Sequence, residues 1–190
     1  MHMMVSHSLG RSLVVIGAAA LFAACGDRTP VAPNRMAPNS AQLDLSPARD
    51  HDRDIQHAVA TLQRVTARFH NLEVAKHEGF VLLHECEVLP GEGPVGIVYV
   101  NMARLTDGVI NPELPDALIY EPETHGPPKL VGAELAIPFS LWTQPEPPKF
   151  LGATFQREDD VGAFGLHVWV WRENPNGLFA ETNPRVSCGA

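Results

Sequence analysis

The hydrophobic pattern of the chain changes within residues 52–83, DRDIQHAVATLQRVTARFHNLEVAKHEGFVLL. Up to His77, large apolar side chains recur every three or four positions, and mostly polar or charged side chains lie between them. This spacing predicts one amphipathic helix over about residues 52–77, with Gly79 in the left-handed conformation just past its end. From Phe80 onward, short runs of β-branched and aromatic residues replace the helical pattern.

Turn segments rich in Pro, Gly and Asn separate these runs, and no helical pattern lies between them. One helix followed by five or six strands is typical of an α+β fold with an antiparallel sheet. We expect the N-terminal helix to pack on a curved sheet, in a cystatin-like or nuclear-transport-factor-like arrangement. A small β-barrel is the alternative. The predicted strands cover residues 80–83, 96–100, 117–120, 130–137 and 165–171.

The N-terminus has the features of an export signal. An apolar run over residues 13–24 follows Arg11 and is too short to cross a bilayer. It ends in Ala23-Ala24-Cys25, which resembles a bacterial lipobox. The resemblance implies that Cys25 becomes the lipidated first residue of a protein that faces the periplasm or the exterior. The alternatives are a plain secretory signal cleaved near Ala24 and a buried apolar helix.

The chain divides into three parts by composition. Residues 1–24 form the predicted signal peptide. Residues 25–50 comprise the lipidated cysteine and a tether that is rich in Pro and Asn and poor in large apolar residues, so it buries too little surface to fold. Residues 51–190 make one globular α+β domain of ordinary size.

The charge balance limits the partners that the protein can bind. The whole chain has 14 basic and 22 acidic residues and a formal net charge of -8, and loss of Arg11 with the signal makes the mature chain more acidic still. An acidic surface without a basic patch repels phosphate backbones and anionic lipid headgroups. We therefore expect no nucleic-acid partner, and membrane contact through the lipid anchor alone.

Two cysteines remain once Cys25 is lipidated. Cys86 and Cys188 form an even pair in a chain that is directed to an oxidising compartment, which predicts a disulfide between them. The alternative is a pair of thiolates that hold a metal, but neither cysteine has the closely spaced Cys or His residues of a metal site.

The last predicted strand contains the main candidate for chemistry, His167. Alternation places His167, Trp169 and Trp171 on one face of this strand. An imidazole on an apolar face can serve as a metal ligand or a general base, although such a histidine is more often a hydrogen-bonded core residue.

Glu134 interrupts the otherwise uncharged predicted strand 130–137. A carboxylate inside an apolar strand needs a cation, hydrogen bonds or a metal as a partner. If the two strands are neighbours, Glu134 and His167 could meet as an acid/base pair or as two metal ligands. The alternative is an edge position in which Glu134 points to water.

His84 is a weaker candidate metal ligand. It lies in His84-Glu85-Cys86-Glu87, which lacks the two histidines at helical spacing of a zinc-protease motif. The sequence has no nucleophile elbow, Walker loop or dinucleotide fingerprint. The absence of these motifs lowers the expectation of hydrolase, kinase or dehydrogenase chemistry. The sequence indicates no particular cofactor.

The C-terminal sequence LHVWVWRENPNGLFA, residues 166–180, with NPRVSC at residues 183–188, resembles a group of uncharacterised exported bacterial proteins. The resemblance covers roughly residues 55–188 and includes the segment LVGAE at residues 130–134. It implies export and no established activity. Members of that group often have His at the position of Val98, so a site built from that His, Glu134 and His167 would be incomplete here.

These observations favour a binding role. We expect a small-molecule ligand between apolar walls formed by Tyr99, Trp169 and Trp171, with Glu134 and His167 as its polar contacts. A metal- or His/Glu-dependent enzyme is one alternative, and a structural envelope protein with a tightly packed interior is the other. A cavity that contacts both Glu134 and His167 would favour binding or catalysis over a structural role.

Overall fold

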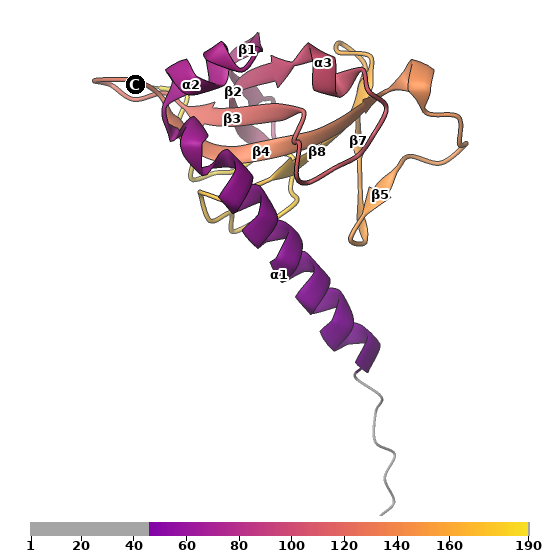
Figure 1. Ribbon diagram of the computed structural model, residues 1–190. Coiled ribbons are helices and arrows are strands. Elements are labelled where there is room, and N and C mark those ends of the chain that lie inside the picture. Colours follow the sequence, from indigo (N-terminus) through magenta and orange to yellow (C-terminus); the bar gives the residue numbers. More distant parts are fainter. Residues whose placement is uncertain (1–45, 190) are drawn as a thin grey trace, which may run out of the picture. The chain divides into compact units, whose positions relative to one another are not determined.

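The computed structural model describes residues 46–189 (Figure 1). The predicted signal, Cys25 and nearly all of the predicted tether therefore lie outside the described residues. None of the helices formed by residues 46–189 is long and apolar enough to span a membrane. The helical elements are α1 Ser46–Thr66, η1 Ala67–His70, α2 Leu72–His77, α3 Met102–Leu105 and η2 Phe139–Leu141.

The predicted α+β class is confirmed. Six strands form an antiparallel sheet in the order β1-β2-β3-β4-β8-β7, which curls strongly into a half-barrel, and β5 and β6 form a separate small hairpin. The helix therefore packs on a curved open sheet and not on a closed barrel. The strands are β1 Phe80–Leu89, β2 Gly93–Asn101, β3 Ala117–Glu121, β4 Lys129–Pro138, β5 Lys149–Phe150, β6 Ala153–Thr154, β7 Gln156–Glu158 and β8 Ala163–Val168.

The predicted single helix over residues 52–77 is wrong in two respects. Helix α1 begins earlier, at Ser46, and the helical segment breaks after Thr66 into a 3-10 turn before α2 begins. Asn71 causes the second start, because its side chain accepts a hydrogen bond from the backbone N–H of Glu73 at 3.0 Å. An asparagine in this position caps a new helix more readily than it continues an old one.

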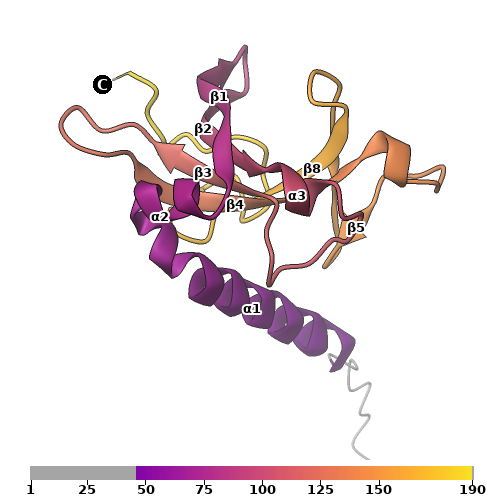
Figure 2. The ribbon, with the colours of Figure 1, turned by 45° about the horizontal axis from the view of Figure 1, so that its top comes forward.

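Helices α1 and α2, with η1 between them, cover one face of the sheet (Figure 2), whereas Leu105 of α3 clusters with Val98 and Ala136. Leu62 of α1 is fully buried in the main core together with Leu135 of β4 and Leu166 of β8. Two side-chain hydrogen bonds fix this packing: the Tyr120 hydroxyl donates to the Phe69 carbonyl at 2.8 Å, and Gln63 Nε2 donates to the Val170 carbonyl at 2.8 Å. Because side chains alternate along a strand, the neighbours of Leu135 and Leu166 face away from α1.

Strand β8 ends at Val168, three residues before the predicted end. Trp169 turns out of the ladder, and its indole N–H donates to the Ala180 carbonyl at 2.6 Å. The Trp171 indole N–H donates to the Thr66 hydroxyl at 2.9 Å, on the helix side of the sheet. The predicted alternation therefore holds for His167 and Trp169, whose rings lie edge to face with centroids 6.0 Å apart, and fails only for Trp171, which lies on the helix side.

The predicted Cys86–Cys188 disulfide is confirmed. It joins edge strand β1 to the C-terminal segment, with a Cα–Cα distance of 5.3 Å and a sequence separation of 102 residues. A disulfide of this kind fits an extracytoplasmic protein. It holds in place the segment 178–188, which has no helix or strand of its own and runs back along the sheet.

Candidate functional site

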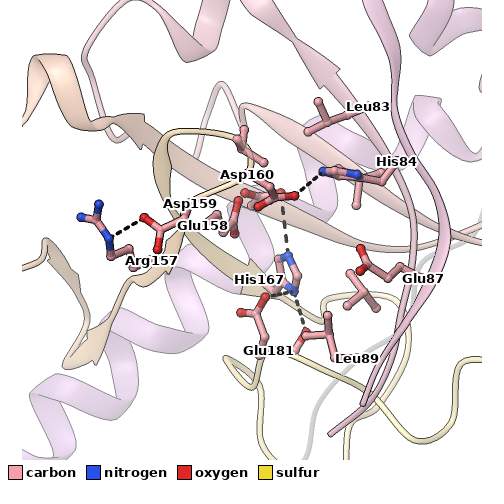
Figure 3. A pocket seen from close by; sticks show the side chains of 14 residues that line it. Leu83, His84, Glu87, Leu89, Arg157, Glu158, Asp159, Asp160, His167 and Glu181 are labelled. Carbon is pink, nitrogen blue, oxygen red and sulfur yellow. Dashed lines mark hydrogen bonds and ion pairs between the residues drawn. The ribbon is translucent and has the colours of Figure 1, made fainter.

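A cavity of about 440 Å³ opens on the side of the sheet opposite α1 (Figure 3). Strand β1 forms one wall, and β7 with the following turn forms the other, so the two edge strands of the curled sheet enclose it. Leu83, Leu89 and Val98 supply part of its apolar lining. Six acidic residues also line it: Glu87, Glu134, Glu158, Asp159, Asp160 and Glu181.

Glu134 and His167 lie side by side in this cavity. They are directly paired residues of the neighbouring strands β4 and β8, and they are 4% and 3% exposed. The His167 Nε2 to Glu134 Oε2 distance is 3.8 Å, which is too long for a hydrogen bond. The structure thus brings together the two residues that the sequence singled out and leaves a gap between their polar atoms.

Glu134 is not at a sheet edge, because β4 lies between β3 and β8. Its side chain is more than nine-tenths buried. Among the side-chain hydrogen bonds formed by residues 46–189, none reaches its carboxylate. Burying a carboxylate without such partners is costly, so this position needs a charge or a donor that the surrounding chain does not supply.

The orientation of His167 is fixed by the C-terminal segment. Its Nδ1 lies 2.7 Å from the backbone carbonyl of Glu181. A carbonyl only accepts, so Nδ1 carries a proton, and in the neutral ring Nε2 has the free lone pair. This lone pair faces Glu134, whose ionised form is also an acceptor. A positive centre between the two atoms would satisfy both.

Glu158 of β7 brings a second carboxylate to the same place. One oxygen of Glu134, one of Glu158 and one His167 nitrogen all lie within 4.8 Å of one another. The Glu158 Oε1 atom is buried and has no hydrogen-bond partner among the described residues. Three potential ligand atoms thus converge, and the carboxyl groups of two of the residues have no hydrogen-bond partner within the described domain.

Gly165 makes this convergence possible. It precedes His167 by two residues on the same face of β8, and its φ angle requires no glycine. A Cβ atom at this position would lie 2.0 Å from Glu158 Oε1 and 2.6 Å from Glu134 Oε1. The missing side chain therefore provides the space in which the two carboxyl groups meet.

The electrostatic surroundings favour protonation of both carboxyl groups. Burial raises the pKa of Glu158 to about 8, with further contributions from the negative charges of Glu181 and Asp160. Burial also raises the pKa of Glu134 well above its ordinary range, and Glu158, Glu181 and Asp116 add to the shift. Two carboxyl groups this close and this buried do not both ionise without a cation.

His84 lines the same cavity at its exposed side. Its Nε2 atom lies 3.5 Å from Asp160 Oδ2, across the gap between β1 and the turn after β7 (Figure 3). His84 is thus near the converging ligands without being one of them. Val98 of β2 is a separate part of the same cavity lining.

The three expected aromatic walls do not line the cavity. Trp169 packs with Ile119 and Val131 in a small separate cluster. The Tyr99 ring lies edge-on to Tyr120, with centroids 5.5 Å apart, and Trp171 packs against the helices. The cavity is therefore more acidic than the sequence suggested.

Sequence reasoning missed Glu158 and Glu181. Glu158 lies in QRE, residues 156–158, a three-residue strand that is followed by Asp159 and Asp160 and resembles a surface turn. Glu181 contributes its backbone carbonyl from a segment without regular structure, which no residue pattern marks. A glycine inside the strand, Gly165, was the one available signal that a group approaches closely there.

No protein-family model, no curated protein and no solved structure matches the chain.

Proposed function

We propose that the protein is a lipid-anchored extracytoplasmic binding domain whose cavity takes a small positively charged ligand. The observation that carries this proposal is Glu134, a carboxyl group that is buried beside a histidine lone pair and has no hydrogen bond among residues 46–189. A cation would supply the missing partner to both groups. Unpartnered buried polar groups that face a cavity are candidates for ligand contact.

The charge of the cavity supports a cation over an anion. Six acidic side chains line it, against Arg157 and two histidines. Arg157 is already engaged: its Nε atom lies 2.7 Å from Asp159, and its guanidinium lies 4.0 Å from the centre of the Phe139 ring. A cavity lined by one sign of charge concentrates ligands of the opposite sign.

The size of the cavity supports binding over a purely structural role. A domain that served only as a packed envelope component would fill the space around Glu134 and His167 with side chains. A cavity of about 440 Å³ instead contacts both residues and has apolar walls, a combination typical of small-ligand sites.

The location rests on two features. The lipobox-like segment that ends at Cys25 supports a lipid anchor in the bacterial cell envelope, and the disulfide fits the same compartment. The Cys25→Ala variant should appear in the soluble fraction or retain its uncleaved signal, whereas the parent protein should fractionate with membranes and incorporate labelled fatty acid. Label incorporation by the variant would contradict the anchor.

A ligand panel tests the binding role. The thermal unfolding midpoint of the full-length protein would be measured with millimolar Zn²⁺, Mn²⁺ or Ca²⁺, with a primary alkylamine, and with a neutral alcohol of the same length. A cation present at about 100 times its Kd should raise the midpoint by about 5 °C or more. The rise should vanish in Glu134→Gln. A panel in which no cation raises the midpoint would overturn the proposal.

A further inference from the structure

We propose that the cation is a divalent transition-metal ion such as Zn²⁺, held by Glu134, Glu158 and His167. This inference rests on the proposed function, that the cavity binds a cation, and goes further by naming the ligand and its three protein contacts. It follows from the convergence of three ligand atoms in one buried corner, where the Glu134 side chain lacks any other partner within the described domain.

The distances fit a metal ion after a small adjustment. Zinc bonds to nitrogen and carboxylate oxygen are about 2.0–2.2 Å long, which places ligand atoms of a tetrahedral site about 3.4 Å apart. The three atoms here lie within 4.8 Å of one another, and His167 Nε2 is 3.8 Å from Glu134 Oε2. Metal binding therefore requires the ligand atoms to approach by up to about 1.4 Å, which rotation of the two glutamate side chains would supply.

The kinds of donor atom select the metal. One imidazole nitrogen and two carboxylate oxygens suit Zn²⁺, Fe²⁺, Co²⁺ or Mn²⁺, whereas Ca²⁺ and Mg²⁺ prefer oxygen ligands throughout. Three protein ligands also leave at least one coordination position open to the cavity, which is larger than a single ion requires. The site would therefore hold the ion with water or a small ligand on its open side.

The surroundings of His167 have the arrangement of a metal site. Metal-binding histidines usually donate their second ring N–H to a carbonyl or carboxylate, which aims the other nitrogen at the ion. His167 Nδ1 makes this contact with the Glu181 carbonyl at 2.7 Å, and the Glu181 carboxylate lies 3.9 Å from the same nitrogen. The histidine is thus oriented before any ion arrives.

Gly165 offers a test that removes no ligand. In Gly165→Ala the added methyl group would occupy the position at which the two carboxyl groups now meet, 2.0 Å from Glu158 Oε1. His167, Glu134 and Glu158 would all remain, but the carboxyl groups would be pushed apart. If the three residues bind one ion together, this variant should lose affinity as the ligand variants do.

The experiment is titration calorimetry with Zn²⁺ alone on the full-length protein, purified without a histidine tag, with metal content checked by elemental analysis. The parent protein should bind one Zn²⁺. Glu134→Gln, Glu158→Gln and His167→Ala should each weaken binding by more than about 100-fold, the upper end of the cost of losing an outer-shell partner, and Gly165→Ala by at least about 10-fold. Circular dichroism checks that each variant is folded.

Matched controls keep the test specific. Glu85→Gln changes an exposed acid of β1 outside the cavity, and His125→Ala changes an exposed histidine between β3 and β4. Both should keep the parent affinity. Cobalt supplies a second readout, because Co²⁺ bound by the three residues gives a visible absorption band that His167→Ala should abolish.

Three results would overturn the metal assignment: Zn²⁺ binding that survives Glu134→Gln, Ca²⁺ binding as tight as that of Zn²⁺, or a cavity that binds the alkylamine and no metal. The last result would leave the proposed cation-binding function standing. If neither metals nor amines bind, both proposals fail.

Discussion

Two buried glutamates of the same sheet, Glu121 and Glu134, differ in what surrounds them. Glu121, at the end of β3, is 7% exposed, and its carboxylate pairs with the Arg172 guanidinium and accepts the backbone N–H of Ser187 at 3.0 Å. Glu134, in the middle of β4, is buried as deeply and has no such partner in the part of the chain that the structure describes. The first carboxylate holds the C-terminal segment on the sheet, whereas the second is available to something outside the chain.

The comparison shows that burial alone does not mark a functional carboxylate. In the sequence both residues are single acids within β-rich runs, and only their partners distinguish them. Partnered buried charges serve structure, and breaking them costs stability. Unpartnered ones lower stability in the free protein, and their presence indicates a ligand.

The largest decrease in stability is expected for loss of the disulfide, because it holds in place the C-terminal segment that contacts both Glu121 and His167. That segment supplies the Ser187 N–H to Glu121 and the Glu181 carbonyl to His167. Replacing Cys86 and Cys188 with Ser should lower the free energy of unfolding by about 4 kcal/mol, as expected for a loop of about 100 residues. Urea unfolding measures this. A loss below about 1 kcal/mol would show that the segment is held by its other contacts alone.

The next effect concerns Glu121 itself. Glu121→Ala leaves a partly buried guanidinium and a backbone donor without partners, and should lower the free energy of unfolding by about 3 kcal/mol. Glu121→Gln keeps an acceptor for Ser187 and should cost less. Urea unfolding of both variants at one pH measures the difference. Equal losses would mean that the carboxylate charge contributes nothing.

Asp116 is a third buried acid, with fewer partners than Glu121 and more than Glu134. It accepts one hydrogen bond, from the Ala136 N–H at 2.8 Å, and burial still raises its pKa to about 7. Because this folded-state pKa lies above the unfolded value of about 3.9, protonated Asp116 stabilises the folded protein at low pH. This contribution to stability is lost as the pH rises through about 7.

Asp116→Asn should therefore flatten the pH dependence of stability. The parent protein should lose about 2 kcal/mol more than the variant between pH 5 and pH 7, because only the parent must release a proton from this site. Urea unfolding at several pH values measures the two slopes. Parallel curves would show that a single backbone hydrogen bond is enough to keep this carboxylate ionised.

The strand patterns predicted the fold class and most of the strands, and they identified Glu134 and His167 but not Glu158. Alternation singled out Glu134 and His167 on their strands, but whether the two strands are neighbours stayed open until the structure showed β4 paired directly with β8. The start of α2 after Asn71 depends on one side-chain hydrogen bond, and β8 ends where the Trp169 indole bonds to the Ala180 carbonyl, so periodicity showed neither boundary.

Glu158 was beyond sequence reasoning for a different reason. It reaches the cavity because β7 pairs with β8, which sets Glu158 opposite Ala163, two residues before Gly165, and this contact is set by the order of strands in space. Charged residues in a short segment are usually solvated, and nothing local distinguishes this one. A site assembled from an edge strand and a central strand can therefore be predicted only when the pairing register of the strands is known. That register is known only from the fold.

The smallest predicted change in the free energy of unfolding is an increase, and it tests the comparison of Glu121 with Glu134 most directly. Glu134→Gln replaces a buried group that is costly to ionise with a neutral group of the same shape, so at pH 8 it should raise the free energy of unfolding by about 1 kcal/mol in the absence of metal. Glu85→Gln, the exposed control, should change stability by less than about 0.5 kcal/mol. Urea unfolding of both proteins after chelation measures these values.

Saturating Zn²⁺ should then reverse the order, because an ion that binds only the folded parent stabilises it by mass action and leaves Glu134→Gln unchanged. A glutamate that weakens the free protein and strengthens the loaded one is kept for its ligand. If Glu134→Gln instead destabilises the protein as Glu121→Ala does, with or without the ion, the two glutamates are equivalent and Glu134 is a structural residue.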